Sequence, residues 1–114
     1  LRERLIECLS CVTRDIQSYG KGDIFKKYLE KSMRFISIIN SDEYQPSLYI
    51  IHECAGIISD LCDLYNRDMA SFIDDDSIKY MTKELKKTGV SDSIIVAEHL
   101  QQKALMLRIT AVNL

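Results

Sequence analysis

Apolar residues recur along the chain with the spacing of amphipathic helices. The first stripe, with polar side chains opposite, predicts a helix over Leu1–Tyr19. A turn at Gly20–Asp23, with Asp23 as the N-cap, leads into a second helix over Ile24–Asn40. The side chains expected to point inward from these two helices are Leu1, Leu5, Cys8, Leu9, Val12, Ile16, Tyr19, Phe25, Leu29, Met33, Ile36 and Ile39.

The clearest pattern predicts a third helix over Pro46–Tyr65, with Pro46 in its first turn. Its apolar arc covers more than half of the circumference, which is more than one neighbouring helix can cover. We therefore expect this helix at the centre of the fold, packed on two sides. The apolar arc contains Ile50, Ile51, Cys54, Ile57, Ile58, Leu61, Leu64 and Tyr65, and the remaining narrow strip contains Tyr49, His52, Glu53, Gly56, Ser59, Asp60 and Asp63.

The last third of the chain predicts two more helical regions. The first covers Met69–Thr88, with a break at Asp74–Ser77 where an Asp or Ser77 caps the second piece, and Gly89 ends it. The second covers Ser93–Val112. Short connections predict antiparallel neighbours. Alternate helices begin roughly 45 residues apart, which is typical of HEAT or armadillo repeats, although a simple five-helix bundle gives similar spacing.

Composition supports an all-α fold and narrows the possible functions. The 114 residues include only four Gly and one Pro, too few for the frequent turns of a β-sandwich. The 15 basic and 17 acidic side chains argue against sequence-independent nucleic-acid binding. No apolar run approaches the roughly 20 residues that span a bilayer, so we expect no membrane partner. Because the chain opens directly in helical rhythm, we expect a fragment of a longer protein.

Short motifs in the chain do not predict catalysis or metal binding. Cys8 and Cys11 form a C-x-x-C pair in mid-helix without a second ligand pair, so we expect both, like the other cysteines, to be buried free thiols of an intracellular protein. His52 begins a zinc-protease pattern, but Gly56 stands where its second His belongs. Asp74–Asp76 is expected to cap a helix. We therefore expect no enzyme, cofactor or metal site.

Several segments together resemble the carboxyl-terminal end of the importin-beta (karyopherin-beta) family. They are Leu1–Asp23, Met33–Ile39, and Cys54–Cys62 followed by Arg67-Asp68, where the family has a small-residue helix ending Ala-Gly-Leu-Ile-Gly-Asp-Leu-Cys. The likeness covers roughly residues 1–90, keeps register through the loops and weakens after Gly89. The family's last helix often carries a Trp, which this chain lacks.

The resemblance implies an α-solenoid of HEAT repeats across residues 1–114. Residues 1–19 would be the inner helix of a preceding repeat, and residues 24–65 and 68–113 would form two helix pairs. Helices one, three and five would line the concave surface. The family imports proteins into the nucleus, so the implied locations are the cytoplasm, the nucleus and the pore between them. The implied partners are an importin-alpha-type adaptor or basic cargo, with Ran GTPase and nucleoporins contacting the full-length receptor.

A basic helical ligand requires carboxylates on the concave strip. Our hypothesis assigns this role to five residues, Glu3, Glu7, Glu53, Asp60 and Asp63. An ordinary solvated face is the competing interpretation of the same residues. The alternative function is a self-contained helical-bundle adaptor or regulatory domain that binds a partner helix in a groove. A solenoid fragment exposes apolar surface on its first helix, whereas a complete bundle buries it.

Overall fold

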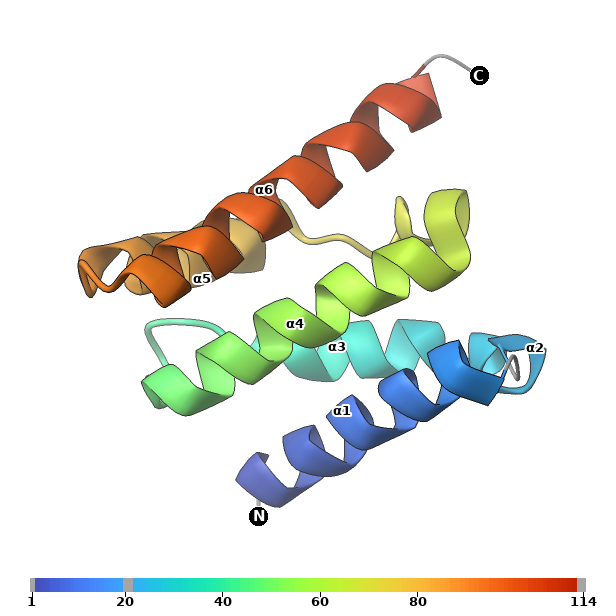
Figure 1. Ribbon diagram of the computed structural model, residues 1–114, viewed down its shortest axis with the longest axis horizontal. Coiled ribbons are helices and arrows are strands. Elements are labelled where there is room, and N and C mark those ends of the chain that lie inside the picture. Colours follow the sequence, from blue (N-terminus) through green and yellow to red (C-terminus); the bar gives the residue numbers. More distant parts are fainter. Residues whose placement is uncertain (1, 20–21, 113–114) are drawn as a thin grey trace.

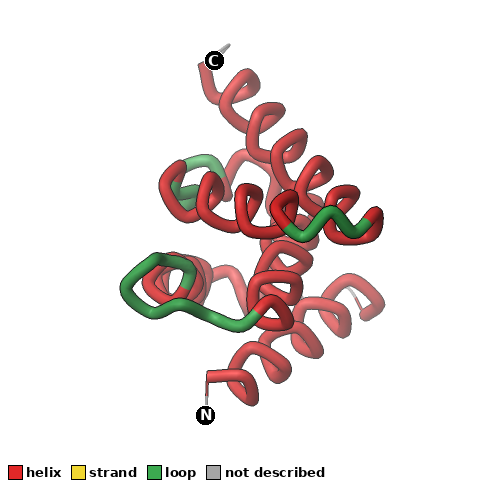
Figure 2. Tube along the Cα trace, turned by 90° about the vertical axis from the view of Figure 1, so that its left-hand side faces the viewer, coloured by secondary structure: helices red, strands yellow, loops and turns green. Residues whose placement is uncertain are grey.

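Helices form two layers in the structure, a computed structural model that describes residues 2–19 and 22–112. One layer contains α1 (Arg2–Tyr19), α4 (Leu48–Tyr65) and α6 (Ser91–Val112), which lie side by side and run in the same direction (Figure 1). The other contains α3 (Leu29–Ile39) and α5 (Asp75–Lys87), which run the opposite way (Figure 1), and Figure 2 shows the two layers from the side. The predicted all-α fold of antiparallel helix pairs is confirmed. The predicted positions Leu1, Gly20 and the side chain of Tyr19 lie outside the described part.

Helix α4 lies at the centre of the fold, as its wide apolar arc predicts. It packs against α1 on one flank and against α6 on the other, and it also contacts α5. Its buried side chains join a single hydrophobic cluster with residues from the other long helices. The buried residues of α4 are Ile50, Ile51, Cys54, Ala55, Ile57, Ile58, Ser59, Leu61 and Cys62.

Helix α4 begins two residues later than the sequence predicts. The Ser47 hydroxyl accepts a hydrogen bond from the backbone N–H of Ile50 at 3.2 Å, so Ser47 is the N-cap and Leu48 is the first helical residue. Pro46 therefore precedes the cap, and the prediction that it lies in the first turn is wrong. At the other end the helix stops at Tyr65, where Asn66 has φ +48°, outside the right-handed helical region.

Helix α1 buries only part of the predicted stripe: Ile16 is buried and Leu9 is half-buried against the core, as predicted. Ile6 is also buried, whereas Leu5 and Val12 are 47% and 41% exposed, and Cys8 is exposed too. The prediction that Leu5, Cys8 and Val12 point inward is therefore wrong. The physical reason is that α1 packs mainly on α4, with a smaller contact to α2. Ile6 lies about 100° around the helix from Leu5, so the buried flank is rotated away from the apolar stripe.

Two predicted helices are shorter or less regular than expected. The second divides into α2 (Gly22–Phe25), the 3-10 helix η1 (Lys26–Tyr28) and α3, with Asp23 inside the first turn of α2 instead of at the cap. The tight η1 turn places Lys26 Nζ 3.0 Å from a carboxylate oxygen of Asp68. The fourth predicted helical region, Met69–Thr88, is helical in its second part only. Before α5 the chain forms the 3-10 helix η2 (Asn66–Met69) and a turn.

Helix α5 begins within the predicted break and ends one residue before the predicted end at Thr88. The Asp74 carboxylate accepts a hydrogen bond from the Asp76 N–H at 2.9 Å and caps its N-terminus, and Gly89, with φ +71°, follows its last turn. Two exposed polar contacts also join α6 to α5. A guanidinium nitrogen of Arg108 lies 2.8 Å from a carboxylate oxygen of Asp75, and Lys86 Nζ donates a hydrogen bond of 2.9 Å to Gln101 Oε1.

Candidate functional site

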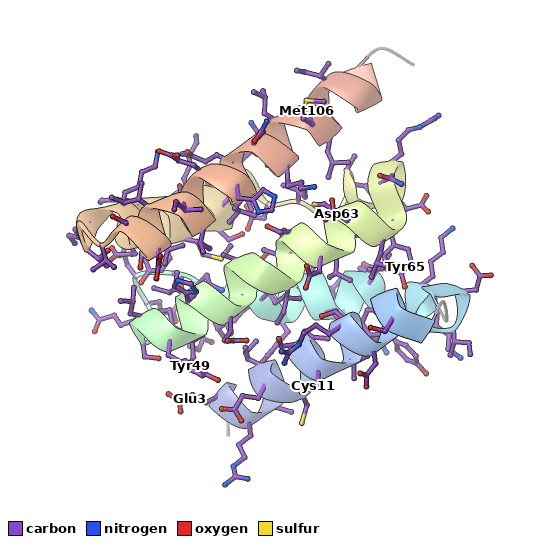
Figure 3. All side chains as sticks on the ribbon, viewed as in Figure 1. Glu3, Cys11, Tyr49, Asp63, Tyr65 and Met106 are labelled. Carbon is purple, nitrogen blue, oxygen red and sulfur yellow. The ribbon has the colours of Figure 1, made fainter. Side chains whose placement is uncertain are left out.

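Three of the predicted carboxylates converge where α1 lies beside α4. The Tyr49 hydroxyl, on the first turn of α4, donates a hydrogen bond of 3.1 Å to Glu7 of α1. Glu3 lies one turn before Glu7 on the same face of α1, and Figure 3 shows it next to Tyr49. Glu53 lies one turn after Tyr49 on the same face of α4. We call Glu3, Glu7, Tyr49 and Glu53 the acidic cluster.

The acidic cluster places several carboxylates around the Tyr49 hydroxyl. Partial desolvation of the ring raises the pKa of the phenol, and its hydrogen bond to Glu7 and the charge of that carboxylate raise it further. The charges of Glu53 and Glu3 act in the same direction. Each of these groups disfavours a phenolate, because a second negative charge at this position would be repelled. A cationic side chain would be attracted for the same reason.

The other two predicted carboxylates lie further along α4. Asp60 is half-buried. Asp63 forms an ion pair with Lys103 of α6, and in Figure 3 it lies far from Glu3. Because Lys103 already neutralises the Asp63 carboxylate, we expect Asp63 to attract a basic ligand less strongly than the acidic cluster does.

Gly56 lies on the exposed side of α4, between Glu53 and Asp60 on the same face. A Cβ atom built at this position would meet no atom within 4 Å. Glycine in a helix interior costs roughly 0.5–1 kcal/mol relative to alanine. Since no neighbouring side chain needs the space, packing inside the described chain does not account for this glycine. The backbone of α4 is therefore open to close approach from outside.

The four cysteines, all free thiols, divide into two kinds. Cys54 and Cys62 of α4 are buried, as predicted. Cys8 and Cys11 of α1 are exposed, so the prediction that the C-x-x-C pair lies in the core is wrong. The reason is the rotated burial of α1, and in Figure 3 Cys11 points away from α4. Arg14 donates a weak hydrogen bond to Cys11 Sγ at 3.6 Å.

The acidic run at Asp74–Asp76 has a structural role, and the described residues contain no candidate metal site. Within residues 2–19 and 22–112, no group of three or more His, Cys, Asp and Glu side chains is placed to hold a metal ion. Asp74 caps α5, as the sequence predicts. None of the helices in the described part of the chain is long and apolar enough to cross a membrane.

Two residues of this surface are not assigned a role by the sequence. Tyr49 interrupts an otherwise polar strip, and its bond to Glu7 joins residues 42 positions apart. Lys103 neutralises Asp63 across 40 positions. Only the exposed position of an aromatic residue on a polar strip could have drawn attention to Tyr49. Helical periodicity carries no information about which side chain on α6 meets α4.

No protein-family model, curated protein or solved structure matches the chain.

Proposed function

We propose that the chain is a non-catalytic protein-binding module of stacked helix pairs, and that its α1–α4 face binds a basic helical segment. The convergence of Glu3, Glu7 and Glu53 on Tyr49 from two helices carries this proposal. Carboxylates gathered at one place attract Lys and Arg side chains and fix the register of the ligand.

The expected interaction is electrostatic and sensitive to salt. An exposed ion pair contributes about 0–1 kcal/mol, so affinity requires several of them. Salt screens such pairs over a Debye length of about 10 Å at 0.1 M. We therefore expect micromolar or weaker binding by the 114-residue chain, with a marked loss as salt rises.

The resemblance to the importin-beta family gives this proposal a biological context. In that context the basic ligand is an importin-alpha-type adaptor segment or cargo bound during nuclear import, and the full-length receptor also meets Ran GTPase and nucleoporins. The arrangement of α1, α4 and α6 in one layer supports this context, because the resemblance implies that helices one, three and five line one surface. The protein would then move between the cytoplasm and the nucleus.

The alternative is a self-contained helical bundle that acts as an adaptor or regulatory domain. A complete bundle is expected to bury the apolar residues of its first helix. Leu5 and Val12 of α1 are 47% and 41% exposed, which favours the stacked-pair proposal.

Removing charge from the acidic cluster tests the proposal. We expect Glu7→Gln combined with Glu53→Gln to weaken binding of a Lys/Arg-rich helical peptide about tenfold at low salt, since two lost pairs of about 0.7 kcal/mol each sum to that factor. Fluorescence anisotropy with a labelled peptide measures the change.

The matched control removes the same charge elsewhere. Asp63→Asn combined with Asp75→Asn takes away two carboxylates that Lys103 and Arg108 already neutralise. We expect this double variant to bind the peptide within about twofold of the unmodified chain. Equal losses in the two double variants would show that net charge, and not the acidic cluster, attracts the peptide.

Gly56 provides a second test, in which stability and binding change in opposite directions. We expect Gly56→Ala to raise the free energy of unfolding by roughly 0.5–1 kcal/mol, because alanine is the better helix former and its Cβ meets no neighbour. The same Cβ should weaken peptide binding by keeping the ligand away from α4. Urea denaturation and anisotropy measure the two effects, and unchanged affinity would rule out close approach at Gly56.

A further inference from the structure

A second surface, separate from the acidic cluster, lies between α1 and the segment formed by η1 and α3. It is an open groove of about 390 Å³. Its walls are largely apolar, and Leu5, Val12 and Tyr28 are between 41% and 47% exposed. The lining residues are Leu5, Cys8, Leu9 and Val12 from α1, and Tyr28, Lys31, Ser32 and Phe35 from η1 and α3.

The position of the groove in the fold indicates what shape fits it. In the described part of the chain, α4 follows α3 and α6 follows α5, so each has an antiparallel helix in the other layer (Figures 1 and 2). Helix α1 has no such companion among these residues. The groove lies along α1 and beside α3, where the two-layer pattern would place one more helix antiparallel to α1.

The charges at the groove are basic. Lys31 lines it, and Lys27 Nζ lies 5.2 Å from the centroid of the Tyr28 ring beside it. Neither lysine has a carboxylate within ion-pair distance among the described residues. An occupant with carboxylates at this edge would therefore gain ion pairs that the chain itself does not supply.

We propose that this groove is the docking site for one amphipathic helix of a partner protein. The helix lies antiparallel to α1 and inserts apolar side chains with i, i+3/i+4, i+7 spacing between Leu5, Val12 and Phe35. Its carboxylates line the edge that faces Lys31 and Lys27. No residue of the acidic cluster lines the groove. Helix docking in the groove and binding of a basic peptide to the acidic cluster can therefore be tested separately.

A stapled synthetic helix of about four turns tests the proposal, with Leu at the inserted positions and Glu along one flank. The matched peptide carries Lys in place of Glu. We expect the acidic peptide to bind the full chain about tenfold more tightly than the basic one, and Lys31→Glu to reverse this preference. Lys31 is exposed on a helix, so the reversal does not depend on a change in folding.

A second pair of variants tests the apolar part of the groove. We expect Leu5→Gln with Val12→Gln to weaken the acidic peptide about tenfold. Ile95→Gln with Leu105→Gln, at exposed positions of α6 (62% and 52%), should leave its affinity unchanged. Circular dichroism checks that both double variants keep their helices.

Three results would overturn the proposal. If neither the acidic nor the basic peptide binds, helix docking in the groove is excluded. Equal binding of both peptides, or a preference that Lys31→Glu does not alter, would exclude an acidic partner. Self-association of the unmodified chain in sedimentation, abolished by the Leu5/Val12 double variant, would show that a second copy covers the groove.

Discussion

Leu61→Ala is expected to lower the free energy of unfolding by about 3 kcal/mol, far more than a substitution at an exposed position of the chain. Leu61 is fully buried in α4, which packs against α1, α5 and α6. Shortening this side chain removes apolar contacts and leaves a cavity that helices fixed on several sides cannot fill. Because domains are stable by only about 5–15 kcal/mol, the loss should be plain in urea denaturation.

The same substitution at an exposed leucine is the control. Leu105 lies on α6 with 52% of its surface exposed, and Leu105→Ala should change stability by about 0.5 kcal/mol or less. Similar losses for the two variants would contradict the central position of α4.

Alkaline pH is expected to destabilise the fold through the two buried thiols. Burial raises the pKa of Cys54 from 9.0 to about 11, and burial does the same for Cys62. In the unfolded chain both thiols ionise near pH 9.0, whereas in the folded chain they stay protonated until about pH 11. Their stabilising contribution is therefore complete below pH 9.0 and is lost as the pH rises toward 11. Each thiol adds a slope of up to about 1.4 kcal/mol per pH unit.

Paired variants separate these thiols from other groups that titrate in the same range. The ion pair with Asp68 raises the pKa of Lys26, which also makes stability fall at alkaline pH. We therefore compare slopes of stability against pH. Cys54→Ala with Cys62→Ala should flatten the slope between about pH 9 and pH 11, whereas Cys8→Ala with Cys11→Ala should not.

Thiol labelling gives an independent readout of the same burial. A disulfide reagent at neutral pH should modify Cys8 and Cys11 in the folded chain, and Cys54 and Cys62 only after unfolding. Rapid labelling of all four thiols in the folded chain, or equal alkaline slopes in the two variants, would contradict the buried position of the α4 cysteines.

The sequence predicts α4 well because its environment is nearly symmetric. A helix covered on two sides buries most of its apolar arc, so the arc read from the sequence and the buried face largely overlap. Ser59, which the sequence places on the polar strip, is buried as well. Helix α1 packs mainly on α4, and periodicity alone does not show which part of its apolar arc faces α4. For this reason Ile6 is buried where the sequence predicts Leu5.

The candidate site was predictable only in part. Helical spacing places Glu3 on one face with Glu7, and Glu53 on one face with Asp60, because i, i+4 and i, i+7 positions coincide. The association of the two helices depends on packing, as does the bond between Tyr49 and Glu7. The ion pair between Lys103 and Asp63 likewise depends on how α6 packs against α4.

The two surfaces have complementary chemistry. The α1–α4 face gathers carboxylates around a tyrosine and leaves the backbone open at Gly56, whereas the groove beside α3 is apolar and edged by lysines. A module with these two surfaces can contact a basic segment and an acidic amphipathic helix at the same time. Their variants, Glu7→Gln with Glu53→Gln and Lys31→Glu, distinguish the two interactions.

Mapping a basic helical peptide onto the isotope-labelled chain by NMR is the most direct test of the proposed function. We predict that amide shifts change most around Glu3, Glu7, Tyr49, Glu53 and Gly56, and that the changes diminish as salt is added. Shift changes centred on α5 or on the outer side of α6, or none at saturating peptide, would contradict the assignment of the α1–α4 face as the binding surface.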